Sequence, residues 1–75
     1  MRSVQRRFAR ATGLTQSAIW HIERAQRAAA LLTSGVAILD TVDQAGYFDQ
    51  PHLTRELRRL IGRTPAQILR ARGSA

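Results

Sequence analysis

The sequence lacks several residue types, and each absence excludes a class of protein. It contains no cysteine, which excludes disulfide bonds, zinc sites with cysteine ligands and thiol catalysis. Its longest apolar run, residues 28–32, is far shorter than the ~20 residues that span a bilayer. Arginines recur through residues 1–10 and interrupt any apolar core of a signal peptide. We therefore expect no membrane partner, and a cytoplasmic location is compatible with these absences.

Lysine is also absent, so all 12 basic residues are arginine; they stand against five acidic residues and give a net charge of +7. Such an excess favours a polyanionic partner, with nucleic acid ahead of a membrane. The charge is uneven, because residues 1–10 carry +4 and residues 50–75 carry +5, whereas residues 36–49 carry −3. Clustered arginines are typical of proteins that neutralise phosphates. The alternative, two solvated faces that keep a small domain soluble, stays open.

Helical periodicity predicts an all-α fold, since no stretch has the alternation of a strand. Apolar stripes at helical spacing predict helices near residues 2–12, 16–33, 37–45 and 49–61, with a fifth from residue 65 onward. Glycines at positions 13, 35, 46 and 62 follow these stripes and are typical of helix C-termini. The expected N-caps are Thr15, Asp49 and Thr64, and Gln67 completes a capping box with Thr64.

The chain also resembles itself at an offset of 49 residues. Residues 3–20 align with residues 52–69, and the identical pairs are Arg6/Arg55, Arg10/Arg59, Gly13/Gly62, Thr15/Thr64 and Ile19/Ile68. A helix, its stop and the next cap recur at fixed distances, so we interpret the match as a structural repeat rather than a coincidence between arginine-rich helices. A short helix and a turn precede only the second copy. We therefore expect the native reading frame to continue upstream of Met1.

Two short helices joined by a glycine-containing turn, as predicted for residues 37–60, are typical of a helix-turn-helix, whose second helix enters the major groove of DNA. The stretch from Ala45 to Arg59, followed by Gly62-Arg63-Thr64-Pro65, resembles the second helix-turn-helix of AraC/XylS-type transcriptional regulators. Residues 5–8, 12–15 and 24–32 are similar to that family's first recognition helix and long linker helix. The chain departs from the family in having Thr41 at a usually apolar site and Val42 at a site that usually holds alanine.

The resemblance implies an all-α, homeodomain-like fold with two subdomains, the first of them incomplete. Residues 1–14 would be a remnant of the first helix-turn-helix, residues 15–34 the linker helix and residues 35–75 the complete second motif. The implied function is sequence-specific regulation of transcription, with two recognition helices in successive major grooves. A linker of ~18 residues would be ~27 Å long, close to the ~34 Å turn of B-DNA.

The same resemblance implies double-stranded DNA as the partner, RNA polymerase as a second partner if the protein is an activator, and a bacterial, nucleoid-associated location. A homodimer is left open. We expect no cofactor and no enzymatic activity, because no nucleophile–base pair and no phosphate-cradling glycine loop is visible. The alternative function is a helical protein-interaction module, whose arginine faces meet acidic proteins and whose apolar stripe meets a partner helix. An RNA-binding helical protein is the third interpretation.

The predicted base-reading residues lie on the outward early turns of the helix that begins near Asp49; they are Gln50, Pro51, His52 and Arg55. Arg55 can make a bidentate contact to guanine, and Gln50 can pair with adenine. By the resemblance, the matching first-copy residues are Arg2, Gln5 and Arg6. Phosphate contacts are predicted for Arg7, Arg10, Arg58 and Arg59, although some of these could instead pair with Glu56. We expect Trp20 to pack in the core or between the subdomains rather than to stack on a base.

Overall fold

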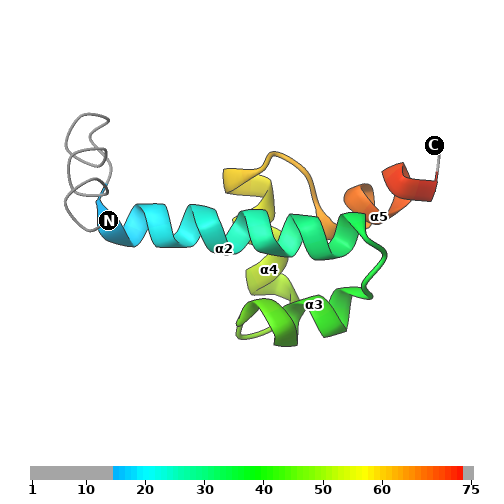
Figure 1. The fold of residues 1–75 in the computed structure, drawn as a ribbon, viewed down its shortest axis with the longest axis horizontal. Helices are drawn as coiled ribbons and strands as arrows, with labels where there is room; N and C mark the ends of the chain where they lie inside the picture. Colours follow the sequence, from blue (N-terminus) through cyan, green and yellow to red (C-terminus); the bar gives the residue numbers. More distant parts are fainter. Residues whose placement is uncertain (1–14, 74–75) are drawn as a thin grey trace.

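The computed structural model describes residues 15–73, and within this range the backbone forms four helices and no strand (Figure 1). The helices are α2 (Gln16–Thr33), α3 (Ile38–Ala45), α4 (Gln50–Leu60) and α5 (Pro65–Gly73). The all-α prediction is confirmed for this part of the chain, and the helix bounds agree with the predicted ones to within a residue or two. The helix predicted at residues 2–12 lies outside the described residues.

α2 is the long axis of the molecule, and the three shorter helices gather around its C-terminal part (Figure 1). α3, α4 and α5 all contact α2, and each also packs against a neighbour in the chain. The buried residues of α2 begin only at Arg24, and they recur to Leu32 at helical spacing. The second half of α2 therefore belongs to the core of the helix-turn-helix, whereas its first half projects beyond that core.

Local signals set where each helix begins. Thr15 Oγ1 accepts a hydrogen bond from the backbone N–H three residues on at 3.0 Å, and Asp49 Oδ1 does the same at 2.8 Å. At the start of α5, Gln67 N donates to Thr64 Oγ1 at 3.1 Å and Thr64 N donates to Gln67 Oε1 at 2.8 Å. These bonds satisfy N–H groups that have no partner within the helix. All three predicted N-caps and the capping box are confirmed.

The turn between α3 and α4 depends on Gly46, whose φ of 84° lies in the left-handed region that a side chain disfavours. There the chain reverses, and Tyr47 N donates to Val42 O at 2.9 Å. Gly35 and Gly62 have the same kind of conformation after α2 and α4. The predicted helix stops at these glycines are therefore confirmed, and the predicted stop at Gly13 lies outside the described residues.

The core draws on all four helices and on the turn. Its buried apolar members are Ala25, Ala28, Leu32, Ala45, Tyr47, Leu53, Leu57 and Ile68. Thr41, at the site where an apolar residue is usual, is fully buried as well. Its hydroxyl donates to Ala37 O at 3.0 Å, so the substitution leaves no buried polar group unsatisfied.

Trp20 is not a core residue, because 54% of its surface is exposed. The prediction of core packing is therefore wrong. Trp20 lies on the first half of α2, ahead of the buried stretch, and the Arg24 guanidinium is 4.6 Å from the centroid of its ring. A contact between subdomains would involve residues 1–14, which lie outside the described residues.

The end of α5 is tied to the end of α2. Arg72 Nε donates to the carbonyl oxygen of Thr33 at 3.1 Å, and a cation at this position also suits the negative end of the α2 dipole. The last helix thereby caps the longest one. No helix between residues 15 and 73 is both long enough and apolar enough to cross a membrane.

Candidate nucleic-acid interface

The outward face of α4 brings three of the four predicted base-reading residues of the second motif together. Gln50, Pro51 and Arg55 are exposed, and with Thr54 they line one depression on the surface of the N-terminal half of α4. Pro51 and Arg55 are four residues apart and so share a ridge of the helix. Thr54 was not among the predicted site residues, although its spacing from Gln50 could have placed it there.

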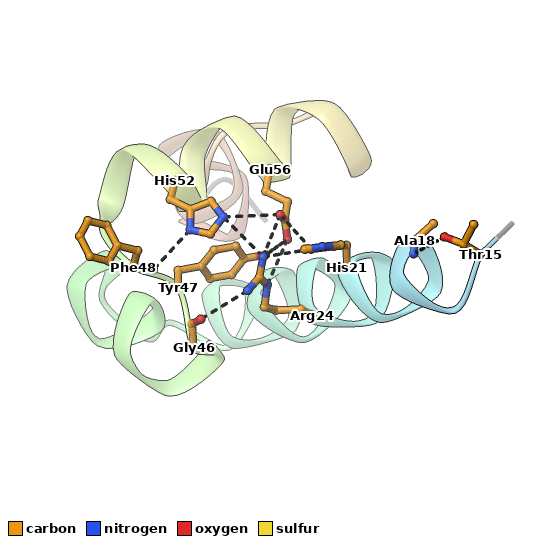
Figure 2. A network of polar contacts seen from close by, with 9 residues as sticks. All are labelled: Thr15, Ala18, His21, Arg24, Gly46, Tyr47, Phe48, His52 and Glu56. Carbon is orange, nitrogen blue, oxygen red and sulfur yellow. Dashed lines mark hydrogen bonds and ion pairs between the residues drawn. The ribbon is translucent and has the colours of Figure 1, made fainter.

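His52, the fourth predicted reader, is positioned differently. Its side chain is only 33% exposed. Nδ1 accepts a hydrogen bond from Phe48 N at 3.3 Å, and Nε2 lies 3.7 Å from Glu56 Oε2 on the protein side (Figure 2). Both ring nitrogens thus face groups of the protein. His52 borders the reading face and also helps to hold the turn that precedes α4.

The two predicted phosphate contacts on α4, Arg58 and Arg59, lie exposed in its last turn, where cations are stabilised by the helix dipole. Together with Arg55 they give the outward face of α4 three positive charges. None of the three forms a hydrogen bond or an ion pair with another residue between 15 and 73. Neither Arg58 nor Arg59 pairs with Glu56, because Glu56 faces inward, toward α2. A pairing of Arg7 or Arg10 with Glu56 lies outside the described residues.

Behind the outward face lies a buried ion pair between Arg24 of α2 and Glu56 of α4, each about 5% exposed (Figure 2). Arg24 Nη2 donates to Glu56 Oε2 at 2.9 Å, and Arg24 Nε donates to Oε1 at 3.1 Å. Such a two-pronged contact fixes orientation as well as distance. The guanidinium also reaches the turn, where Nη1 donates to Gly46 O at 3.4 Å.

Aromatic rings line this ion pair. The Tyr47 hydroxyl donates to Glu56 Oε1 at 2.9 Å, and the Arg24 guanidinium lies 4.3 Å from the centroid of the Tyr47 ring. The Trp20 ring is nearly as close to the same cation, on the solvent side of α2. Cation–π contacts of this kind stabilise a guanidinium that burial has stripped of water. Among the described residues, no buried side-chain polar atom lacks a partner.

A second histidine completes the cluster. His21 Nδ1 lies 3.2 Å from Arg24 Nη2 and 3.4 Å from Glu56 Oε2. His52 approaches the same guanidinium from α4, with 3.5 Å between Nε2 and Nη2. Glu56 is thus the single acidic centre of a cluster drawn from α2, the turn and α4.

Burial and hydrogen bonding shift the pKa values of Tyr47 and Glu56. Burial, followed by the hydrogen bond to Glu56 and its negative charge, raises the pKa of Tyr47 to about 12. For Glu56, burial acts to raise the pKa of the carboxyl, but the hydrogen bonds from Arg24 and Tyr47 and the nearby positive charge outweigh it. The pKa of Glu56 therefore lies below its ordinary value of 4.5. Glu56 is ionised and Tyr47 neutral throughout the physiological range.

Sequence reasoning missed this cluster, although a signal for it was present. Arg24 precedes Ala25 and stands four residues before Ala28, so it lies on the apolar stripe of its helix. Glu56 likewise lies three residues after Leu53 and beside Leu57. Opposite charges on the apolar stripes of two helices indicate a buried pair, because an unpaired buried charge is very costly.

The remaining predicted site residues are those of the first copy. They are the base-reading Arg2, Gln5 and Arg6 and the phosphate-binding Arg7 and Arg10. All five lie outside the described residues, so they stay predictions.

Comparison with known families agrees with the fold. A family model described as a helix-turn-helix domain, of the AraC type, matches residues 1–71. Comparison with curated proteins and with solved structures gives no match. This family match, with which the all-helical fold agrees, supports a DNA-binding helix-turn-helix protein of the kind that regulates transcription. The chain belongs to the AraC-type helix-turn-helix family, as its sequence resemblance predicted.

Proposed function

We propose that the protein is a sequence-specific regulator of transcription whose helix α4 reads bases in the major groove. The observation that carries the proposal is the outward face of α4, where exposed Arg55 shares a depression with Gln50 and Pro51 while the opposite face is buried in the core. A helix held from behind and exposed at its N-terminal turns has the geometry of a recognition helix.

The residues of α4 would contact different parts of the DNA according to their position on the helix. Arg55 would donate to the O6 and N7 acceptors of guanine, and Gln50 would pair with adenine. Pro51 would pack against a base edge, and His52 would contribute least, since both of its ring nitrogens face the protein. Arg58 and Arg59, in the last turn, would contact phosphates.

A second reading element would come from residues 1–14, with Arg2, Gln5 and Arg6 toward the bases and Arg7 and Arg10 toward phosphates. In this proposal α2, which has 18 residues, is the linker helix, and residues 35–75 form the complete motif. At about 27 Å, α2 spans most of one turn of B-DNA. RNA polymerase would be a further partner of an activator, a homodimer is compatible with the scheme, and the site of action would be the cytoplasmic nucleoid.

The test starts from the full 75-residue chain and a pool of random duplexes. Repeated selection is expected to enrich a common sequence, and titration is expected to show tighter binding to the selected duplex than to a scrambled one of equal composition. Affinity that is equal for both duplexes would overturn sequence-specific reading. Binding to RNA or to an acidic protein in preference to duplex DNA would favour the RNA-binding or the protein-interaction alternative.

A further inference from the structure

The buried ion pair connects the reading helix α4 to α2 and to the turn between α3 and α4. We propose that Arg24 and Glu56 are positioning residues for DNA reading: they fix the rotation of α4 about its own axis and so the direction in which Arg55 leaves the helix. This inference rests on the proposed function, because it concerns how accurately the reading face is presented.

Position along the chain makes the connection direct. Glu56 immediately follows Arg55, so the two side chains leave α4 about 100° apart. A rotation of the helix by about 10° moves a group about 6 Å from the axis by about 1 Å. A bidentate contact to guanine needs placement within about 0.5 Å. Whatever limits the rotation of α4 therefore limits how well Arg55 discriminates between bases.

Apolar packing alone limits that rotation poorly. Leu53 and Leu57 anchor α4 in the core, but the hydrophobic effect is non-directional. The Arg24 guanidinium, by contrast, is a planar fork that grips both oxygens of the Glu56 carboxylate. The Tyr47 hydroxyl donates to the same carboxylate from the turn. Two side chains from two other segments thus converge on one side chain of α4.

Stability alone does not account for this arrangement. Desolvation of two charges offsets most of their attraction, and replacing a buried ion pair by apolar residues of similar volume is often neutral or stabilising. Positions 24 and 56 adjoin the core residues Ala25 and Leu57, so apolar side chains there would extend the core. Orientation of α4 is what the ion pair supplies and an apolar pair does not.

The experiment replaces the pair by Arg24→Met with Glu56→Leu in the full chain. Its matched control is Arg27→Met with Glu23→Leu, which removes the same two charges from exposed positions of α2. The probes are the duplex selected by the unmodified protein and its scrambled counterpart. Thermal unfolding, the ratio of the two affinities and the salt dependence of binding are measured for each protein.

We expect the buried double variant to melt at or above the temperature of the unmodified protein. Its preference for the selected duplex should nevertheless fall about tenfold, which corresponds to about 1.4 kcal/mol. The salt dependence should stay unchanged, because the phosphate contacts are kept. The control variant should keep the full preference. A purely structural role would instead lower the melting temperature and weaken binding to both duplexes alike.

An unchanged preference in the buried double variant would overturn the proposal, since apolar packing would then orient α4 unaided. If that variant does not fold, Tyr47→Phe is the second test, because it removes one hydroxyl and keeps the ring. We expect the preference of Tyr47→Phe for the selected duplex to fall about threefold. An unchanged preference in this variant would overturn the proposal. Failure of the proposed function is separate, because the unmodified protein itself would then prefer no duplex.

Discussion

The inward and outward faces of α4 carry charges of opposite sign, one glutamate against three arginines. Inside, the carboxylate of Glu56 is held by Arg24 and Tyr47. Outside, Arg55, Arg58 and Arg59 have no ion-pair partner among residues 15–73. On this one helix, the buried charge is paired inside the protein, whereas the exposed charges remain available to bind a polyanion.

The largest expected effect comes from breaking the inward pair on one side only. Glu56→Leu leaves the Arg24 guanidinium buried without its carboxylate, which costs about 3–5 kcal/mol. That is most of the stability of a small domain, so the variant should be largely unfolded. Circular dichroism during urea unfolding measures the loss. Glu23→Leu, at an exposed position of α2, is the control and should stay within about 0.5 kcal/mol of the unmodified protein.

Loss of less than about 1 kcal/mol in Glu56→Leu would contradict this view of the inward face. Arg24 would then be able to reach water through the first half of α2, where Trp20 is half-exposed.

The inward face should also respond to high pH. Tyr47 has its pKa raised from 10.0 to about 12, so its protonated form is favoured in the folded protein. The resulting stabilisation is fully present below pH 10.0 and is lost as the pH rises to about 12; it amounts to about 3 kcal/mol. Urea unfolding measured across this range should show the decline, and Tyr47→Phe should lack it. Absorbance of the tyrosinate follows the titration directly, because the chain has a single tyrosine. Ionisation of folded Tyr47 near pH 10.0 would contradict the prediction.

On the outward face, Arg55→Ala should cost about 1–3 kcal/mol on the selected duplex and relax the preference at one base pair. The fold should be unaffected, because the Arg55 side chain is exposed and unpaired within the described part of the chain. Titration against the selected and scrambled duplexes measures the change. Equal losses on both would show that Arg55 anchors a phosphate and that the reading face lies elsewhere on α4.

Arg59→Ala is the matched variant one helical turn further on and should have the smaller effect. It should weaken all duplexes to a similar extent and lower the salt slope by about one unit. Loss of affinity for the selected duplex only would place Arg59 among the reading residues.

Much of the fold could be predicted because its signals are local. Each helix cap and helix stop acts within a few residues of chain. The structure has N-caps at Thr15, Asp49 and Thr64 and a left-handed glycine at position 46, as predicted. The same holds for the exposed side of α4, since its Leu53 and Leu57 stripe fixes which face is buried.

What could not be predicted depends on how α2 crosses α4. The apolar stripes place Arg24 and Glu56 on buried faces, but the two residues are 32 positions apart. The spacing within either helix does not give the contacts that they make with each other and with the turn. The core packing predicted for Trp20 was wrong for the same reason, because its exposure depends on where along α2 the other helices pack. His52 was assigned to the reading face alone, although its ring also serves the turn and the buried cluster.

The sequence distance between Arg24 and Glu56 has a consequence for the order of folding. The pair closes a loop that contains the whole of α3 and most of α4, so it forms only after those helices have docked, since the entropy of closing the loop must first be overcome. Until then both charges stay hydrated. We therefore expect the pair to be largely absent from the transition state for folding: breaking it on one side, as in Glu56→Leu, should speed unfolding and leave the folding rate nearly unchanged. Loss of one partner should therefore shorten the lifetime of the native state without slowing its formation.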